Sequence, residues 1–72
     1  MQNNVNKLLE CKNKSVRVFA LTISSLRHSQ GFYSRWYYNL LEMGDEELED
    51  LINTISEQNF NNELDVVLWL EG

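Results

Sequence analysis

Residue types that carry catalysis or metal binding are sparse in this sequence. His28 is its only histidine and Cys11 its only cysteine. A zinc site needs three or four ligands at short spacing, and these two residues stand far apart. The stretch 45–50 is rich in carboxylates, yet it lacks the internal glycine of a calcium loop and shows no pair set to face a cleft, as glycoside hydrolysis requires. The sequence therefore predicts a protein that is not an enzyme and that uses no metal or cofactor.

A second set of residues is suited to molecular recognition. Five aromatic residues stand within seven positions after Gly31, namely Phe32, Tyr33, Trp36, Tyr37 and Tyr38. Tyr and Arg dominate the hot spots of protein interfaces, and Arg27 and Arg35 flank this cluster. Because one helix cannot turn every tyrosine inward, we expect at least one on the surface and assign Tyr33 to that role. The candidate binding corner consists of Arg27, Gln30, Tyr33 and Arg35.

Charge is divided between the two halves of the chain. The residues before Trp36 hold all six Lys and Arg with one acid, a net +5, whereas the residues after it hold ten acids and no base, a net −10. Such segregation concerns partners and association. Two readings stay open: the halves attract each other within one domain, with Arg35 paired to a nearby acid, or the acidic segment binds a partner. The candidate acidic binding residues are Asp45, Glu46, Glu49 and Asp50.

Periodicity predicts the elements that position these residues. Apolar residues recur at helical spacing, and the predicted helices span residues 3–12, 16–28, 30–43, 46–58 and 63–70. A β-hairpin over 16–28 is the alternative, because that stretch is rich in β-branched residues. We expect an all-α fold, a small bundle of four to five short helices organised around residues 29–38. Residues 1–72 then form a single helical domain, in which 1–14 is a loosely packed N-terminal helix.

Local signals place the helix ends. Asn3 or Asn4 is expected to cap the first helix, Ser15 the second, Asp45 the fourth, and Asn61 or Asn62 the last. Gly31 is expected to form a sharp junction between two helices, either with a left-handed backbone or at a point where another backbone segment approaches closely. Gly44 is expected to end its helix as a C-terminal glycine. The asparagines around Phe60 predict a turn. The expected core comprises Phe19, Ile23, Phe32, Trp36, Leu40, Leu48, Leu51, Ile52, Ile55, Leu64 and Leu68.

The length and the apolar pattern of the chain lead to expectations about its association and its location. Seventy-two residues support only a thin core, and the aromatic helix and the nearly all-apolar last helix offer more apolar surface than one monomer covers. We therefore expect a homodimer. No apolar run reaches the length of a membrane span, and the N-terminus does not resemble a secretory signal. We expect a cytoplasmic protein with no membrane partner.

One stretch resembles a known group of proteins. Ser29-Gln30-Gly31-Phe32-Tyr33-Ser34-Arg35, then Asn39-Leu40, then Leu68-Trp69-Leu70-Glu71-Gly72 resemble short uncharacterised proteins of Gram-positive bacteria, their phages and conjugative elements. Those proteins read Ser-Gln-Gly-Phe-Tyr-Gly-Arg, followed by an acidic helix and a Trp-Ile/Leu-Glu-Gly-like end. The likeness covers residues 29–72. Ser34 stands where the family often has glycine, which weakens any argument for close backbone approach there. The resemblance implies a mobile-element protein acting inside a bacterial cell, and it carries over no activity.

Two functional hypotheses follow. The first is a small acidic phage or mobile-element protein that binds a host or element protein as an inhibitor or adaptor; its sharper version is a nucleic-acid mimic. The alternative is a helix-turn-helix-like regulator that binds nucleic acid, with Arg17, Arg27 and Arg35 on phosphates. A pI near 4.6 weighs against the second, because phosphate binding requires concentrated positive charge.

Overall fold

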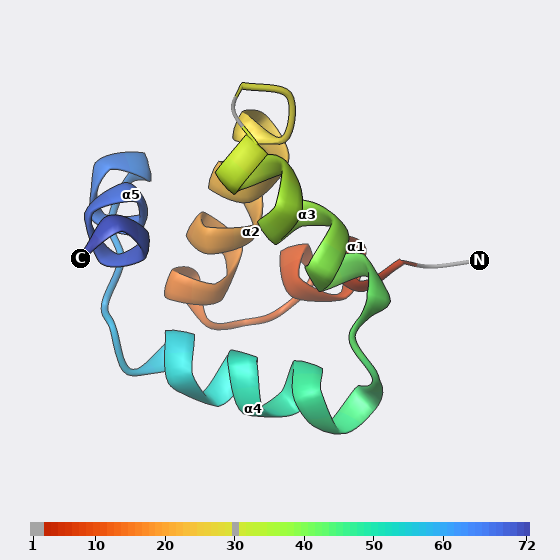
Figure 1. The fold of residues 1–72 in the computed structure, drawn as a ribbon. Coiled ribbons are helices and arrows are strands. Elements are labelled where there is room, and N and C mark those ends of the chain that lie inside the picture. The colour runs from red at the N-terminus through yellow and green to blue at the C-terminus, as the bar shows by residue number, and fades with distance from the viewer. Residues whose placement is uncertain (1–2, 30) are drawn as a thin grey trace.

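The computed structural model describes residues 3–29 and 31–72, and the described chain is all-α, as the periodicity predicts (Figure 1). Five helices follow one another: α1 (Asn4–Leu9), α2 (Lys14–Leu26), α3 (Gly31–Glu42), α4 (Asp45–Ser56) and α5 (Glu63–Glu71). The stretch predicted at 16–28 is helical, so the hairpin alternative is wrong. Each helix is close to its predicted position.

The centre of the bundle is α2, not the stretch 29–38. This helix packs against each of the four others, and α1 also packs on α3. Figure 1 shows α2 in the middle, with α5 at one side, α1 at the other and α4 running beneath. Its inward residues Val16, Phe19, Ala20 and Ile23 are fully buried. They recur at helical spacing, and so the sequence of α2 itself dictates the face that becomes the core.

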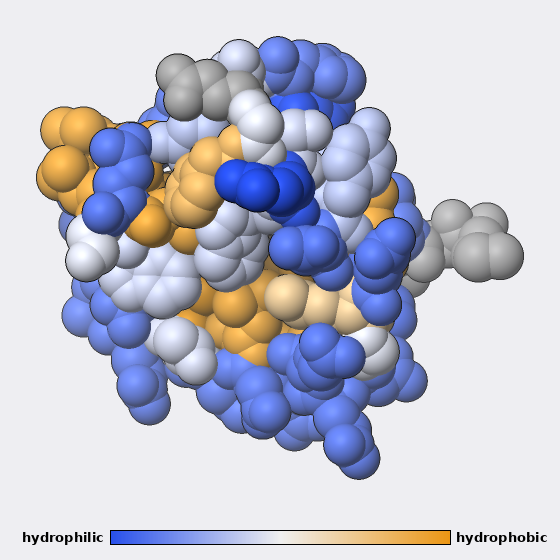
Figure 2. All heavy atoms as spheres, viewed as in Figure 1, coloured by the Kyte–Doolittle hydropathy of each residue, from blue (hydrophilic) through white to orange (hydrophobic). Residues whose placement is uncertain are grey.

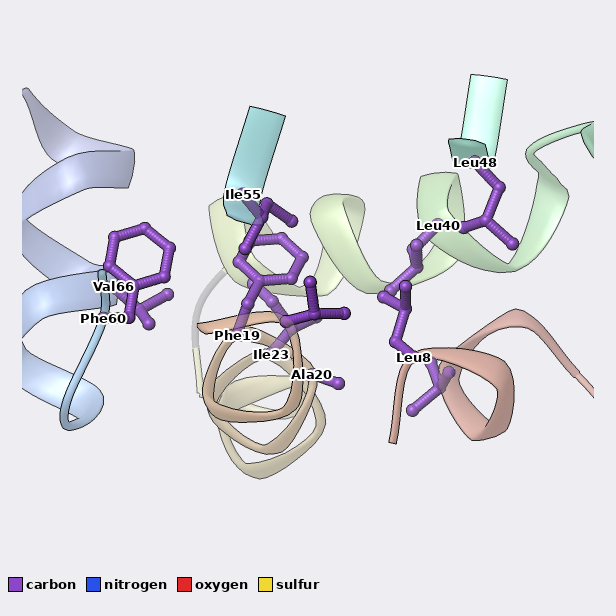
Figure 3. Close-up of a cluster of buried hydrophobic side chains, with 11 residues drawn as sticks. Leu8, Phe19, Ala20, Ile23, Leu40, Leu48, Ile55, Phe60 and Val66 are labelled. Carbon is purple, nitrogen blue, oxygen red and sulfur yellow. The ribbon is translucent and has the colours of Figure 1, made fainter. Parts of the chain in front are cut away.

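The core gathers apolar residues from every helix. Figure 3 shows Phe19, Ala20 and Ile23 of α2 between Phe60 and Val66 on one side and Leu8 on the other. The Phe19 ring meets the edges or faces of Trp36 and Trp69 at 5.8 and 6.2 Å between centroids, in the T-shaped geometry that aromatic pairs favour. Phe60 meets Trp69 at 5.7 Å. Aromatic packing thereby joins α2, α3 and α5.

The predicted core is confirmed in part. Phe19, Ile23, Leu40, Leu48 and Ile55 are buried, and Trp36, Leu51 and Ile52 pack against them half-buried. Phe32, Leu64 and Leu68 are wrongly placed in the predicted core, because all three are exposed. The buried apolar residues absent from that prediction are Val5, Leu8, Val16, Ala20, Tyr33, Phe60 and Val66. Leu8 and Val5 make α1 a well-packed helix, in contrast to the loose packing expected.

Asparagine begins three of the helices. Asn3, Asn13 and Asn62 each accept a hydrogen bond from the backbone N–H three residues on, at 2.9, 3.2 and 3.1 Å. Asparagine is among the best N-caps, because its short side chain satisfies an orphan amide of the first turn. The cap of α2 is thus Asn13, and the prediction of Ser15 is wrong. The buried Ser15 hydroxyl instead accepts a hydrogen bond from the Phe60 amide at 2.7 Å, which fastens the loop before α5 to α2.

The glycines differ from their predicted roles. No glycine among the described residues has a positive φ; the left-handed residue is Asn59, at φ 56° in the predicted asparagine turn. Gly31 is the first residue of α3, and a Cβ there would meet nothing within 4 Å. Gly44 is extended, at φ −75° and ψ 171°, and is the N-cap of α4 in place of Asp45. Neither junction therefore depends on the conformational freedom of glycine.

Candidate functional site

The predicted binding corner is rearranged in the structure around Tyr33. Tyr33 is buried, with 7% of its surface accessible, and its hydroxyl donates a 2.6 Å hydrogen bond to Glu71 Oε2 at the end of α5. The assignment of Tyr33 as the exposed tyrosine is therefore wrong. Tyr33 and Glu71 line an open hollow of about 530 Å³ together with Phe32 and Leu70. The hydrogen bond to Glu71, then burial and the negative charge of that carboxylate, raise the pKa of Tyr33 above its ordinary value of 10.0.

Tyr38 is the exposed tyrosine of the cluster. Its side chain is 55% exposed, and its ring meets that of Tyr37 edge-on at 5.4 Å between centroids. The guanidinium carbon of Arg27 lies 5.9 Å from the centroid of Tyr37, close enough for a cation–π contact. Arg27 also donates hydrogen bonds to the carbonyl and hydroxyl oxygens of Ser24, which fix it at the end of α2.

Arg35 lies on the outer face of α3. It stands three residues before Tyr38, a spacing that places both on the same side of a helix. Arg35 is exposed and makes no hydrogen bond or ion pair with another described residue. The predicted intramolecular pairing of Arg35 with an acid of the fourth helix is therefore absent from the described part of the chain. We call Arg27, Arg35, Tyr37 and Tyr38 the Arg–Tyr patch.

Sequence reasoning missed Tyr37 and Tyr38 as members of this patch. Gln30, a predicted site residue, lies outside the described residues. The missed signal is the turn of the helix: Tyr33 and Leu40 stand seven residues apart and so share one face, which is the buried one. Tyr38 stands on the other side with Arg35, where the helix meets solvent.

The acidic residues of the candidate site lie along α4. Asp45, Glu46, Glu49 and Asp50 are all exposed, and the buried face of the helix is carried by Leu48 and Ile55. Carboxylates in the first turn of α4 are also favoured there by the positive end of the helix dipole. Among the described residues, the ion pair of this segment joins Asp45 to Lys7 Nζ at 3.6 Å, and the Asp45 side chain is still 97% exposed. Glu46, Glu49 and Asp50 therefore face solvent without a cationic partner in the described chain.

The two predicted groups occupy different ends of the molecule. In Figure 1 the end of α2 and the first turn of α3 lie at the top, whereas α4 runs along the bottom. Figure 2 shows the hydrophilic surface that covers the α4 edge. The structure thus separates one basic, aromatic surface from one acidic surface and does not join them into a single corner.

The described residues contain no group of three or more His, Cys, Asp or Glu side chains placed to hold a metal ion. Cys11 is half-buried and unpaired by any disulfide, and its carbonyl accepts a 2.7 Å hydrogen bond from Arg17. Within residues 3–29 and 31–72, no helix combines the length and apolarity needed to cross a membrane.

No family model, curated protein or solved structure matches this chain. The resemblance of residues 29–72 to phage and mobile-element proteins stays a prediction. The class supported by the fold is a small all-α bundle.

Proposed function

We propose that this chain is a small acidic protein that binds another protein, with the exposed acidic face of α4 as its principal contact surface. One observation supports this most directly: Glu46, Glu49 and Asp50 are exposed and unpaired with any described cation. A run of carboxylates held on one rigid helix presents a fixed pattern of negative charge. Complementary charge of that kind steers encounter and gives specificity.

The partner surface that fits this face is basic. Proteins that bind nucleic acids present such surfaces, so an inhibitor or adaptor that occupies a nucleic-acid-binding groove is the sharper form of the proposal. The predicted origin in a phage or mobile element of a Gram-positive bacterium agrees with this role. The Arg–Tyr patch is a second contact surface of the same protein, since its residue types are those of interface hot spots.

The test is affinity capture from lysate of a Gram-positive host with the tagged protein, followed by mass spectrometry. The triple variant Glu46→Gln, Glu49→Gln and Asp50→Asn removes three charges without changing the size of the side chains. The control, Glu42→Gln with Glu57→Gln, removes two exposed charges outside this face. We expect the triple variant to lose a partner that the wild type and the control both retain. Equal capture by all three proteins would contradict the proposal.

A gel-shift assay at low salt separates the proposal from the helix-turn-helix alternative. The acidic protein is expected to leave DNA and RNA unshifted. A shift that disappears as salt rises, and that is lost in Arg35→Gln, would instead support the nucleic-acid-binding regulator.

A further inference from the structure

The last helix has a second apolar face that the fold does not use. Val66 is fully buried against the core, and Trp69 and Leu70 pack beside it. Leu64 and Leu68 stand on the opposite side, one turn apart, and are 62% and 61% exposed. The helix packs chiefly on α2, and the side of it that faces α2 is the buried one. Figure 2 shows apolar surface gathered at the side where Figure 1 places α5.

The charged residues of α5 itself, Glu63, Asp65 and Glu71, are all acidic. No Lys or Arg follows Arg35 in the chain, so α4 and α5 carry carboxylates alone. Glu63 is exposed at the start of α5, where it lines an open groove of about 430 Å³ with Leu21 and Thr22 of α2. Leu21 is itself 59% exposed. Lys14 of α2 donates a 3.4 Å hydrogen bond to Asn61 just before the helix and forms no ion pair with a described carboxylate.

The exposed leucine pair and the acidic residues of α5 indicate which partner fits this face. We propose that Leu64 and Leu68 bind an amphipathic helix of another protein, and that this helix carries a leucine stripe bordered by Lys or Arg. Paired apolar anchors one turn apart are how helices engage one another. Basic flanks on the incoming helix would meet the carboxylates of α5. This inference rests on the proposed protein-binding function and names the chemistry of its partner.

A second copy of this chain fits the face poorly. Two α5 helices placed together would bring acidic rims against each other, which is unfavourable. The exposed side of α3 carries Arg35 and Tyr38, but Glu42 stands on the same side. The basic helix α1 has already buried its apolar residues Val5 and Leu8. The expected homodimer is therefore not the occupant that charge favours.

The experiment uses isothermal titration calorimetry to measure how tightly the protein binds a synthetic helical peptide with a leucine stripe flanked by lysines. A peptide of the same composition with the leucines dispersed around the helix keeps the charge and loses the stripe. We expect Leu64→Gln with Leu68→Gln to weaken binding of the striped peptide by about tenfold or more. The control Phe32→Gln changes an exposed apolar residue of α3 that belongs to neither proposed contact surface, and it should bind the striped peptide as the wild type does.

Three outcomes would overturn the inference. The leucine variant could bind the striped peptide as tightly as the wild type, the wild type could fail to bind it, or the dispersed peptide could bind equally well. Sedimentation of the wild type and the leucine variant provides a fourth: self-association lost in the variant would make the face an interface between copies. Capture that depends on Glu46, Glu49 and Asp50 but not on the leucines would retain the proposed function and reject the leucine face alone.

Discussion

The Tyr33 hydroxyl donates to the carboxylate of Glu71 across 2.6 Å, and this bond ties the first turn of α3 to the last turn of α5. These residues are thirty-eight positions apart in the chain. A hydrogen bond to an ionised acceptor is stronger than one between neutral groups. The contact also removes Tyr33 from the surface, which leaves Tyr38 as the exposed tyrosine.

Alkaline pH should reveal this bond. The pKa of Tyr33 is raised in the folded protein, so the stabilisation from its neutral hydroxyl is complete below the ordinary value of 10.0 and is lost as pH rises through the raised value. Tyr33→Phe is expected to unfold at a lower temperature near neutral pH and to lose part of the decline in stability that the wild type shows above about pH 10. Thermal unfolding across this range tests it. Tyr38→Phe, whose hydroxyl makes no hydrogen bond to another described residue, should match the wild type.

Asn4 caps the C-terminal end of α3 from another helix. Its buried Nδ2 donates to the carbonyls of Leu40 and Met43 at 2.7 and 2.9 Å, which are among the acceptors that a helix end leaves without partners. Asn4→Asp removes the donor and places a carboxylate against carbonyl oxygens, so we expect a loss of at least about 1–3 kcal/mol in the free energy of unfolding. Asn6→Asp introduces the same charge at an exposed position of α1 and should cost far less. Urea unfolding that gave equal losses would show that charge, not the cap, is responsible.

Ser15 is the other buried polar link between distant segments. Ser15→Ala leaves the Phe60 amide without its acceptor, and we expect a loss of about 1–3 kcal/mol in unfolding free energy. Ser25→Ala changes an exposed serine of the same helix and is the control. Because Phe60 packs on Trp69, the Trp69 fluorescence of the folded protein should also shift in the Ser15 variant. An unchanged stability would mean that water replaces the hydroxyl at no cost.

Gly31 offers a test of the junction between α2 and α3. Gly31→Ala adds a methyl group into open space within a helix, so it should raise the free energy of unfolding by about 0.4–1 kcal/mol through the unfolded state. Gly44→Ala is expected to bring no such gain, since alanine is a poorer N-cap than glycine. Thermal melts of both variants compare the two sites. Destabilisation by Gly31→Ala would restore the idea of a junction that requires glycine.

Much of the fold follows from local signals in the sequence. The helix predicted at 46–58 is observed at Asp45–Ser56 because acidic residues mark its first turn and its apolar stripe lies on one side. The asparagine caps and the turn at Asn59 are equally local. The faces of α5 could not be predicted, since a helix apolar around most of its circumference does not indicate which side meets the core. The predicted core therefore includes Leu64 and Leu68, which are exposed, and omits Val66, which is fully buried.

The candidate site was harder to predict than the fold. The acidic residues of α4 are exposed as expected, because their helical period separates them from Leu48 and Ile55. The basic residues depend on tertiary packing: Arg27 turns onto Tyr37, and Tyr33 turns inward to a glutamate near the far end of the chain. The cap that Asn4 makes on α3 is likewise a long-range contact, which no local pattern in residues 1–14 signals.

The central place of α2 has a consequence for how the protein opens. A helix that touches all four others cannot separate from one of them without exposing a shared core residue such as Phe19 or Ile23. Its middle amides should exchange with deuterium only when the whole chain unfolds, whereas the six-residue α1 and the last turn of α5 exchange through smaller local openings. Slow exchange in α2 then measures global stability directly, and the chain opens from its two ends toward its middle.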